Sequence, residues 1–307
     1  MFTSVEEFSM LALYSAMFIY ALAFIFHAVD LANRSGQVKP VEQASAGKRP
    51  VTRERGSRAL RIGFSLTILA FVFHLAATVG RGVSAGRVPW SNMYEFALTA
   101  TLAIVFIYLI VNIWADLRFL GVLVTGLVLL FLGVARVNYY VAVVPLPPAL
   151  DSYWLVLHII VAVLATGFFT LSFGLSVVQL MQSRRQRRLA ENLPSKTGFL
   201  GTLPSADRLE NLAYRLAIVG FVFWTFTLIA GSIWAEHAWG RYWGWDTKEV
   251  WTFVIWVLYA GYIHARATRG WRGTRSSWLA IIAYSAVIFN FSIVNVFFKG
   301  LHAYSGL

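Results

Sequence analysis

The chain of 307 residues contains no cysteine. It therefore has no disulfide, no thiolate metal site and no thiol nucleophile of its own, and any thiol chemistry must use the sulfur of a partner. Charged residues are also scarce, because Asp, Glu, Lys and Arg make up only 13% of the chain, about half the share in a typical soluble protein. Hydrophobic residues make up 58%. This composition excludes a soluble domain and indicates an integral membrane protein.

Apolar runs of about 20 residues, long enough to cross a bilayer as a helix, recur along the chain. The first run, Met10 to Leu31, follows Glu6 and Glu7 and lacks a small-residue cleavage site, so we interpret it as a retained span. We expect an all-α integral membrane protein with about eight transmembrane helices. The predicted spans are 10–31, 59–80, 94–114, 118–135, 153–180, 213–233, 249–267 and 277–298.

The formal net charge of +12 would suit a nucleic-acid partner, but the distribution of the basic residues argues against one. Of the 26 Lys and Arg residues, 20 lie in alternate loops, which the positive-inside rule places in the cytoplasm. Both termini and the loop 234–251 are therefore expected on the outer (periplasmic or extracytoplasmic) side of the cytoplasmic membrane of the cell. The basic residues left outside are Arg81, Arg87, Arg136, Arg241, Lys248 and Lys299.

Two regions are expected. Residues 1–58 are predicted to form an N-terminal span plus a flexible cytoplasmic linker, because 32–58 is rich in Gly, Pro, Ala, Ser and charges and holds little apolar material. Residues 59–307 then form a polytopic core. The segment 184–212 resembles the first linker in composition. We predict no soluble domain.

Tryptophan is concentrated in one place. Six of the twelve tryptophans fall between Trp234 and Trp256, in and around the predicted outer loop. One interpretation is an aromatic belt, because Trp favours the membrane interface. A belt would scatter its rings over many helix ends, whereas these are packed together with Gly240 and Gly244, which let the backbone turn tightly. The clustering favours a functional surface.

The loop has two further interpretations. Asp246-Thr247-Lys248-Glu249 is a capping-box analogue that would open the seventh span, so Asp246 and Glu249 have a structural explanation. Alternatively, the indole rings form a platform on which a planar apolar ligand stacks. Arg241 and Lys248 would then pair with carboxylates at the edge of the ligand. A porphyrin with two propionates has that shape and charge.

Three stretches of the sequence resemble one family. The run Trp239–Trp251 looks like the WWD signature of haem-handling proteins in cytochrome c maturation. Within that superfamily, Val88–Glu95 and Gly300–Tyr304 are similar to the CcsA/ResC branch (CcsB in some bacteria) of System II cytochrome c-type biogenesis. The resemblance covers the chain from about residue 60 to its end. It implies a haem-binding WWD domain whose cofactor contacts are Trp239, Arg241, Trp243, Trp245, Asp246, Lys248 and Trp251.

The same resemblance implies roles for three of the six histidines. His158, early in the fifth span, and His302, just beyond the eighth, match the axial ligands of an external haem. On residue chemistry alone, each is equally an ordinary interfacial or solvated histidine. His264, in the inner half of the seventh span, matches a ligand to a second haem whose opposite ligand comes from a partner subunit.

The remaining histidines receive no haem role. His27 and His74 lie in the first two spans. Either could supply an imidazole ligand to an intramembrane site, but we favour structural roles for both. His237 precedes the tryptophan run, and the sequence indicates no function for it.

The family resemblance implies that haem b is bound as cargo, delivered to the outer side and joined by thioether bonds to Cys-x-x-Cys-His of apocytochrome c. The implied partners are a Ccs1/ResB-type membrane subunit and a thioredoxin-like thiol reductant, and nucleic acid is not among them. The chain would be one component of a cytochrome c haem lyase (synthase) complex. No catalytic side chain is predicted, because catalysis would work by orientation. The alternatives are a haem exporter, a WWD protein that loads a haem chaperone, and a purely structural subunit.

Overall fold

The computed structural model describes residues 4–37, 57–144, 146, 150–194, 198–268, 270–298 and 300–302. In this part of the chain all regular structure is helical. The α-helices are α1 (Val5–Gln37), α2 (Arg58–Ala85), α3 (Met93–Trp114), α4 (Gly121–Asn138), α5 (Tyr153–Ala190), α6 (Ala206–Trp239), α7 (Thr247–Thr268), α8 (Thr274–Phe289) and α9 (Asn295–Phe297). Short 3₁₀ turns precede α4 (η1, Arg118–Leu120) and α6 (η3, Phe199–Thr202), and a π-helical segment, η4 (Asn290–Val294), joins α8 to α9.

The expected all-α membrane architecture is confirmed. Within the described residues, seven helical segments are long and apolar enough to cross a membrane. The predicted seventh span is α7, a helix of 22 residues that is less apolar because it carries Lys248, Glu249, His264 and Arg266. It nonetheless packs alongside α8 and α6 in the same bundle. The predicted set of about eight helices is therefore present.

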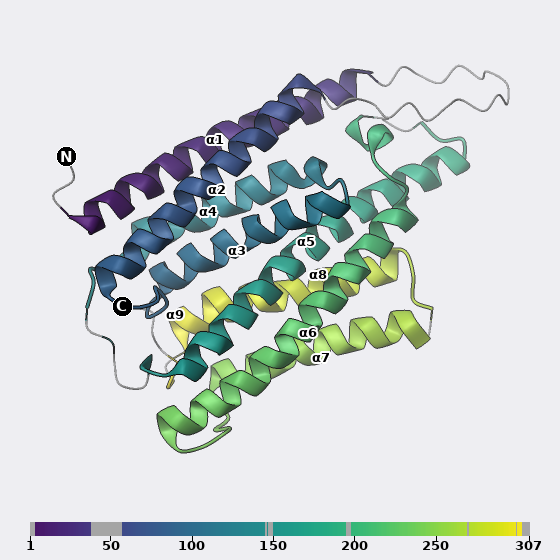
Figure 1. The fold of residues 1–307 in the computed structure, drawn as a ribbon. Helices are drawn as coiled ribbons and strands as arrows, with labels where there is room; N and C mark the ends of the chain where they lie inside the picture. Colours follow the sequence, from purple (N-terminus) through teal and green to yellow (C-terminus); the bar gives the residue numbers. More distant parts are fainter. Residues whose placement is uncertain are drawn as a thin grey trace.

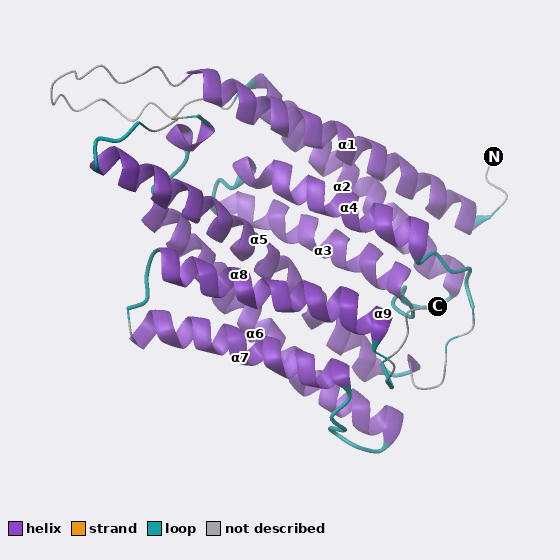
Figure 2. Cartoon of the chain, turned by 180° about the vertical axis from the view of Figure 1, so that it is seen from behind, coloured by secondary structure: helices purple, strands orange, loops and turns teal. Residues whose placement is uncertain are grey.

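The helices form an elongated bundle. Figures 1 and 2 show α1 and α2 as a pair along one edge, α6 and α7 along the opposite edge, and α3, α4, α5 and α8 between them. The start of α1, the end of α9 and the α6–α7 loop lie at one end of the bundle, which we call the loop end (Figure 1). Both termini thus leave the bundle on the same side, as eight spans require. Which side of the membrane the loop end faces stays a prediction.

Three helices extend into the predicted linkers. α1 continues to Gln37, past the predicted start of the first linker at residue 32. α5 continues to Ala190 and includes the arginine-rich run that the sequence assigns to a connecting segment. α6 begins at Ala206, behind an N-cap formed by Ser205. An apolar window detects only the membrane-buried part of a helix, whereas the backbone continues until a residue stops it, here near Pro194. Most of the first predicted linker, 38–56, lies outside the described residues.

His27 and His74 are buried packing residues. His27 Nε2 lies 3.1 Å from Thr67 Oγ1, and the close approach of its ring to Gly121 leaves no room there for a Cβ. His74 Nε2 donates to the carbonyl of Leu98 at 3.0 Å. The ring of each thus binds α1 and α2 to their neighbours, in agreement with the structural role that we favoured for both.

A buried charge cluster fixes the start of α3. Glu95 is fully buried and accepts hydrogen bonds from Arg81 Nε (3.0 Å), Arg87 Nη1 (2.7 Å) and the backbone N–H of Ser91 (2.9 Å). Arg81 also reaches Glu6 Oε1 at 3.2 Å, so α1, α2 and α3 meet at this point. Because every charge has an opposite partner, the cluster holds the segment 88–96 rigidly against the bundle.

Candidate functional site

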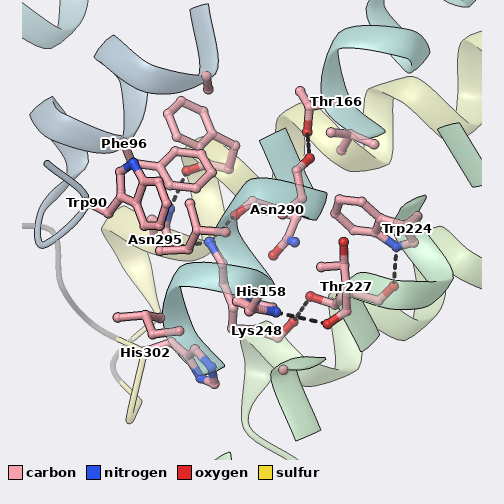
Figure 3. Close-up of a pocket in the computed structure, with 18 of the residues that line it drawn as sticks. Trp90, Phe96, His158, Thr166, Trp224, Thr227, Lys248, Asn290, Asn295 and His302 are labelled. Atoms are coloured by element: carbon pink, nitrogen blue, oxygen red, sulfur yellow. Dashed lines mark hydrogen bonds between the residues drawn. The ribbon is translucent and has the colours of Figure 1, made fainter. Parts of the chain in front are cut away.

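The loop end contains a cavity of about 200 Å³ between α3, α5, α6, α8 and the α6–α7 loop. Its walls are mainly apolar and aromatic, with a few polar groups that converge on it. Figure 3 shows Trp90 and Phe96 on one side, Trp224 on the other, and His158 and Lys248 between them. His302 lies close to His158 at the same end of the cavity. The structure therefore brings both predicted outer histidines to one apolar cavity.

His158 is held by two rigid helices. It lies on α5, and its Nδ1 is 2.9 Å from the backbone carbonyl of Thr227 on α6. A carbonyl only accepts, so Nδ1 carries the proton and Nε2 keeps a free lone pair. Gly231 makes this approach possible, because a Cβ there would lie 2.7 Å from His158 Nδ1. The imidazole is thus oriented as metal-binding histidines are, with one nitrogen anchored and the other available.

His302 is held by the start of α7. Its Nδ1 faces Asp246 Oδ1 at 3.5 Å, which is long for a hydrogen bond. The other oxygen of the same carboxylate accepts the backbone N–H of Leu301 at 2.7 Å. The His302 side chain lowers the pKa of Asp246 well below the usual range of an aspartate, against the opposing effect of burial. Asp246 therefore attaches the segment 300–302 to the loop as an ionised carboxylate.

Two tryptophans of α6 join the histidines. Trp234 stacks on His158 with ring centroids 5.9 Å apart, and its edge meets His302 at 5.3 Å. Trp239, the last residue of α6, contacts His302 at 4.8 Å and Trp234 at 4.8 Å. The two imidazoles are thus packed around a shared indole pair, which fixes their relative position.

Lys248 points into the cavity rather than toward its rim. Its Nζ donates to the backbone carbonyl of Asn290 at 3.2 Å and to Asn295 Oδ1. The π-helical turn of η4 presents this carbonyl, because its backbone lacks the regular i→i−4 pattern. The Asn290 side-chain oxygen is buried and has no hydrogen-bond partner among the described residues. A buried ammonium beside an unpaired acceptor is suited to a polar group of a ligand.

The predicted capping box at the start of α7 is confirmed. Asp246 Oδ1 accepts the N–H of Lys248 at 2.8 Å, and Glu249 Oε2 accepts the N–H of Asp246 at 3.1 Å and of Gly244 at 2.8 Å. Arg241 lies 3.7 Å from Glu249 Oε1 and occupies the space that a side chain at Gly244 would need. Asp246 and Glu249 therefore cap the start of α7, and Arg241 pairs with Glu249 within the loop.

The other predicted tryptophans lie in different surroundings. Trp243 lines the cavity and contacts Trp245 edge-on at 6.0 Å. Trp245 is 77% exposed and has a positive φ of 59°, which is strained for a bulky residue. Trp251 packs against Phe289 at 4.4 Å, away from the cavity. The rings do not form one flat platform; they surround the mouth and side of an enclosed site.

His264 is not brought to this cavity. It lies near the far end of α7, exposed on the outer face of that helix, and its ring makes no hydrogen bond to a described residue. His237 is exposed at the loop end, where its Nδ1 donates to the carbonyl of Ile233 at 2.8 Å. His264 therefore belongs to a separate surface.

Several cavity residues escaped the sequence analysis as ligand contacts. They come from α3 and the segment before it, from α6, and from the α8–α9 junction. Trp90 belongs to the family-like stretch Val88–Glu95, and Trp234 precedes the tryptophan loop. Nothing in the sequence indicates the polar groups of the π-helical turn. The missed residues are Trp90, Phe96, Trp224, Thr227, Trp234, Asn290 and Asn295.

The residues present fit a haem-like ligand. The donor set offers two imidazoles whose Nδ1 atoms already face oxygens, which leaves Nε2 of each for iron. Aromatic walls suit a porphyrin, and Lys248 supplies a buried positive charge for a carboxylate. Within the described residues, no group of three or more His, Asp or Glu side chains forms a metal site of another kind.

The chain is similar to known proteins over most of its length. Residues 90–302 match the family described as cytochrome C assembly protein. The chain is 31% identical over 260 residues to the cytochrome c biogenesis protein CcsA of Guillardia theta, covering 80% of this chain and 86% of that protein. With CcsA of Trieres chinensis it shares 32% identity over 272 residues, covering 80% and 87%.

One solved structure, the cytochrome c haem lyase CcmF, has the same fold, with a TM-score of 0.68 over 95% of this chain. The identity is 14%, and the chain spans about half of CcmF, covering 47% of it. Together the similarities define a multi-pass membrane protein of cytochrome c biogenesis. The chain belongs to the cytochrome c assembly family and, within that family, to the CcsA proteins.

Proposed function

We propose that this chain binds haem at the loop-end cavity and presents it for covalent attachment to apocytochrome c. In this proposal haem b reaches the outer side of the cell membrane as cargo, and the loop end faces outward. A Ccs1/ResB-type subunit completes the complex, and a thioredoxin-like reductant keeps the cysteines of the apocytochrome reduced.

The observation that carries the proposal is the pair of oriented imidazoles. His158 and His302 line one apolar cavity, and both have Nδ1 turned toward an oxygen of the protein. Two imidazoles that each keep Nε2 free form the donor set of a six-coordinate haem. An exporter would need to release haem and has less use for two anchored ligands. The pair therefore favours haem presentation over simple transport.

The chemistry follows from what the chain lacks. With no cysteine, it contributes no sulfur to the product. Each thioether forms when a substrate thiol adds across a haem vinyl group, with sulfur on one vinyl carbon and hydrogen on the other, and no electron is lost or gained. The chain would accelerate this addition by holding the haem in a fixed position while the Cys-x-x-Cys-His segment approaches, which is catalysis by proximity.

The reaction is tested by co-expressing the chain, its partner subunit and a tagged apocytochrome in a host without its own maturation system. We expect a c-type cytochrome whose haem stays attached under denaturing conditions. If the complex is haem-loaded but forms no thioether bond, the ligation step is wrong and export or chaperone loading replaces it.

The ligands are tested separately by absorption spectroscopy of the purified complex. His158→Ala and His302→Ala should each abolish the bis-imidazole bands or lower haem occupancy, because each removes one axial donor. The matched control is His237→Ala, an exposed histidine of the same end whose ring contacts its own helix and Trp154 and does not line the cavity. In a His264→Ala background, which removes the contribution of the second haem proposed below, bis-imidazole bands that survive both cavity substitutions would reject the assignment.

We also propose that His264 serves a second haem at the interface with the partner subunit. Its exposure on α7 and its lack of a described partner support this role, because a packing histidine would be buried and hydrogen-bonded. His264→Ala should lower the haem content of the complex by one site and leave the bands of the loop-end haem unchanged. An unchanged haem-to-protein ratio would contradict the second site.

A further inference from the structure

The two cavity histidines are supported very differently. His158 lies inside a helix of 38 residues, is bonded to the backbone of a second helix and stacks on Trp234. Movement of its ring would require α5 and α6 to separate, and these helices pack together along much of their length. Because residue 231 is a glycine, the backbone of α6 lies directly against the His158 ring. His158 is therefore part of the rigid scaffold.

His302 lies beyond the last helix. α9 ends at Phe297, and in the described segment 300–302 the polar contacts are both made to one carboxylate, that of Asp246. The backbone of Gly300 also rests against this group, because a Cβ there would lie 2.4 Å from Asp246 Oδ2. The other contacts of this segment are those of the His302 ring with Trp234 and Trp239. A short segment beyond the last helix, held by one carboxylate and these ring contacts, opens at lower free energy than a helix within a bundle.

We propose that the clamp is asymmetric: His158 remains on the haem iron throughout the reaction, and His302 is the ligand that the histidine of the apocytochrome replaces. Asp246 acts as a positioning residue that holds His302 in place until the exchange. This inference rests on the proposed function of the cavity.

The exchange balances simply. The bond between iron and His302 Nε2 breaks, and a bond between iron and the imidazole nitrogen of the substrate forms, with no change in oxidation state. The departing segment 300–302 opens the cavity on the side of the tryptophan loop. The cysteines that precede the substrate histidine then lie beside the haem edge, whereas loss of His158 would require the substrate to enter between packed helices.

The first test does not depend on haem. Amide hydrogen exchange is measured on the full chain with its partner subunit, comparing peptides that contain His302 with peptides that contain His158. We expect exchange on the order of tenfold faster or more around His302. Asp246→Asn should accelerate it further in that segment alone, because the amide weakens the contacts that the carboxylate makes with the His302 ring and the Leu301 N–H, yet still caps α7. Glu236→Gln, which removes an exposed carboxylate from the same end, is the matched control.

The second test identifies the ligand that leaves. Carbon monoxide binds ferrous haem only after an axial ligand departs, so its adduct reports the ligand that stays. The adducts of the wild-type and His302→Ala complexes should have the same spectrum, because His158 is opposite the carbon monoxide in both. The adduct of His158→Ala should differ, because its opposite imidazole would be His302, whose Nδ1 faces a carboxylate, whereas Nδ1 of His158 faces a backbone carbonyl. Asp246→Asn should also raise the rate of carbon monoxide binding severalfold.

The outcomes separate the inference from the function beneath it. A complex that holds no haem would contradict the proposed function, whereas the exchange rates still compare the two segments. A haem-loaded complex with equal protection of both segments, or with a wild-type adduct that matches His158→Ala, would overturn the asymmetric clamp and leave haem binding intact.

Discussion

At the residue scale, one glycine decides where the His158 ring can lie. Gly231 faces His158 across the α5–α6 interface, and the imidazole occupies the volume that any larger side chain would fill. His158 and Gly231 are 73 positions apart in sequence. Their relation is visible only in the folded chain.

Gly231→Ala is therefore predicted to displace His158. The added methyl group would lie 2.7 Å from Nδ1, a distance that forces the ring to move and breaks its bond to Thr227. We expect haem occupancy to fall and the bis-imidazole bands to weaken, as measured by absorption spectroscopy. Gly133→Ala, at a helical glycine with nothing within 4 Å, is the control and should leave both unchanged. Equal spectra for the two variants would contradict the prediction.

Asp246 makes the loop sensitive to acid. Its folded-state pKa is lowered, chiefly by His302, so the ionised carboxylate stabilises the folded loop above the ordinary pKa of an aspartate. That contribution is lost as the pH falls from about 4 through the lowered folded-state pKa. We predict that the thermal midpoint of the wild type exceeds that of Asp246→Asn at neutral pH and approaches it in acid. A difference that stays constant with pH would contradict this assignment.

At the element scale, the start of α3 depends on a buried ion pair. The side chains of Arg81 and Glu95 are 2% and 0% exposed. Removal of Glu95 leaves Arg81 buried with the partly exposed Glu6 as its carboxylate, and removal of Arg81 leaves Glu95 paired with Arg87. The same cluster positions Trp90 and Phe96, which form one wall of the cavity. Packing and site geometry are thus coupled through this cluster.

Glu95→Ala should destabilise the protein by about 3–5 kcal/mol, because it leaves Arg81 and Arg87 without their shared partner. The measurement is thermal or denaturant unfolding of the purified protein in detergent. Glu6→Gln is the comparison, because Glu6 is 35% exposed and the substituted group meets water; its effect should be within about 1 kcal/mol. Similar losses for both variants would show that burial of Glu95 is not the cause.

The helices also show how far a hydropathy pattern reaches. Each span that the hydropathy pattern predicts corresponds to a helix of the structure, because a helix that crosses a bilayer needs a long apolar run. The pattern shortened α5 and α6, whose ends at Ala190 and Ala206 lie in charged segments. It gave no sign of the π-helical turn at Asn290, where backbone geometry supplies an acceptor to Lys248.

At the scale of the whole molecule, the sidedness of the loop end is open to direct test. The chain has no cysteine, so single cysteines give an unambiguous label. Asp151 precedes α5 at the loop end, and Arg187 lies in the last turn of the same helix, roughly 50 Å away. In intact cells, a membrane-impermeant maleimide should label Asp151→Cys and spare Arg187→Cys, because the arginine-rich end is expected in the cytoplasm. The reverse pattern would invert the topology.

The sequence by itself determined the membrane class, the set of helices, the capping box and the family. These depend on composition, periodicity and local spacing, which act over one helix or one loop. Tertiary structure decided the site. It joined His158 to His302 through Trp234, turned Lys248 inward and Trp251 away, and left His264 on the outer face of α7. Such relations depend on how distant helices pack, and a linear pattern carries no distance between them.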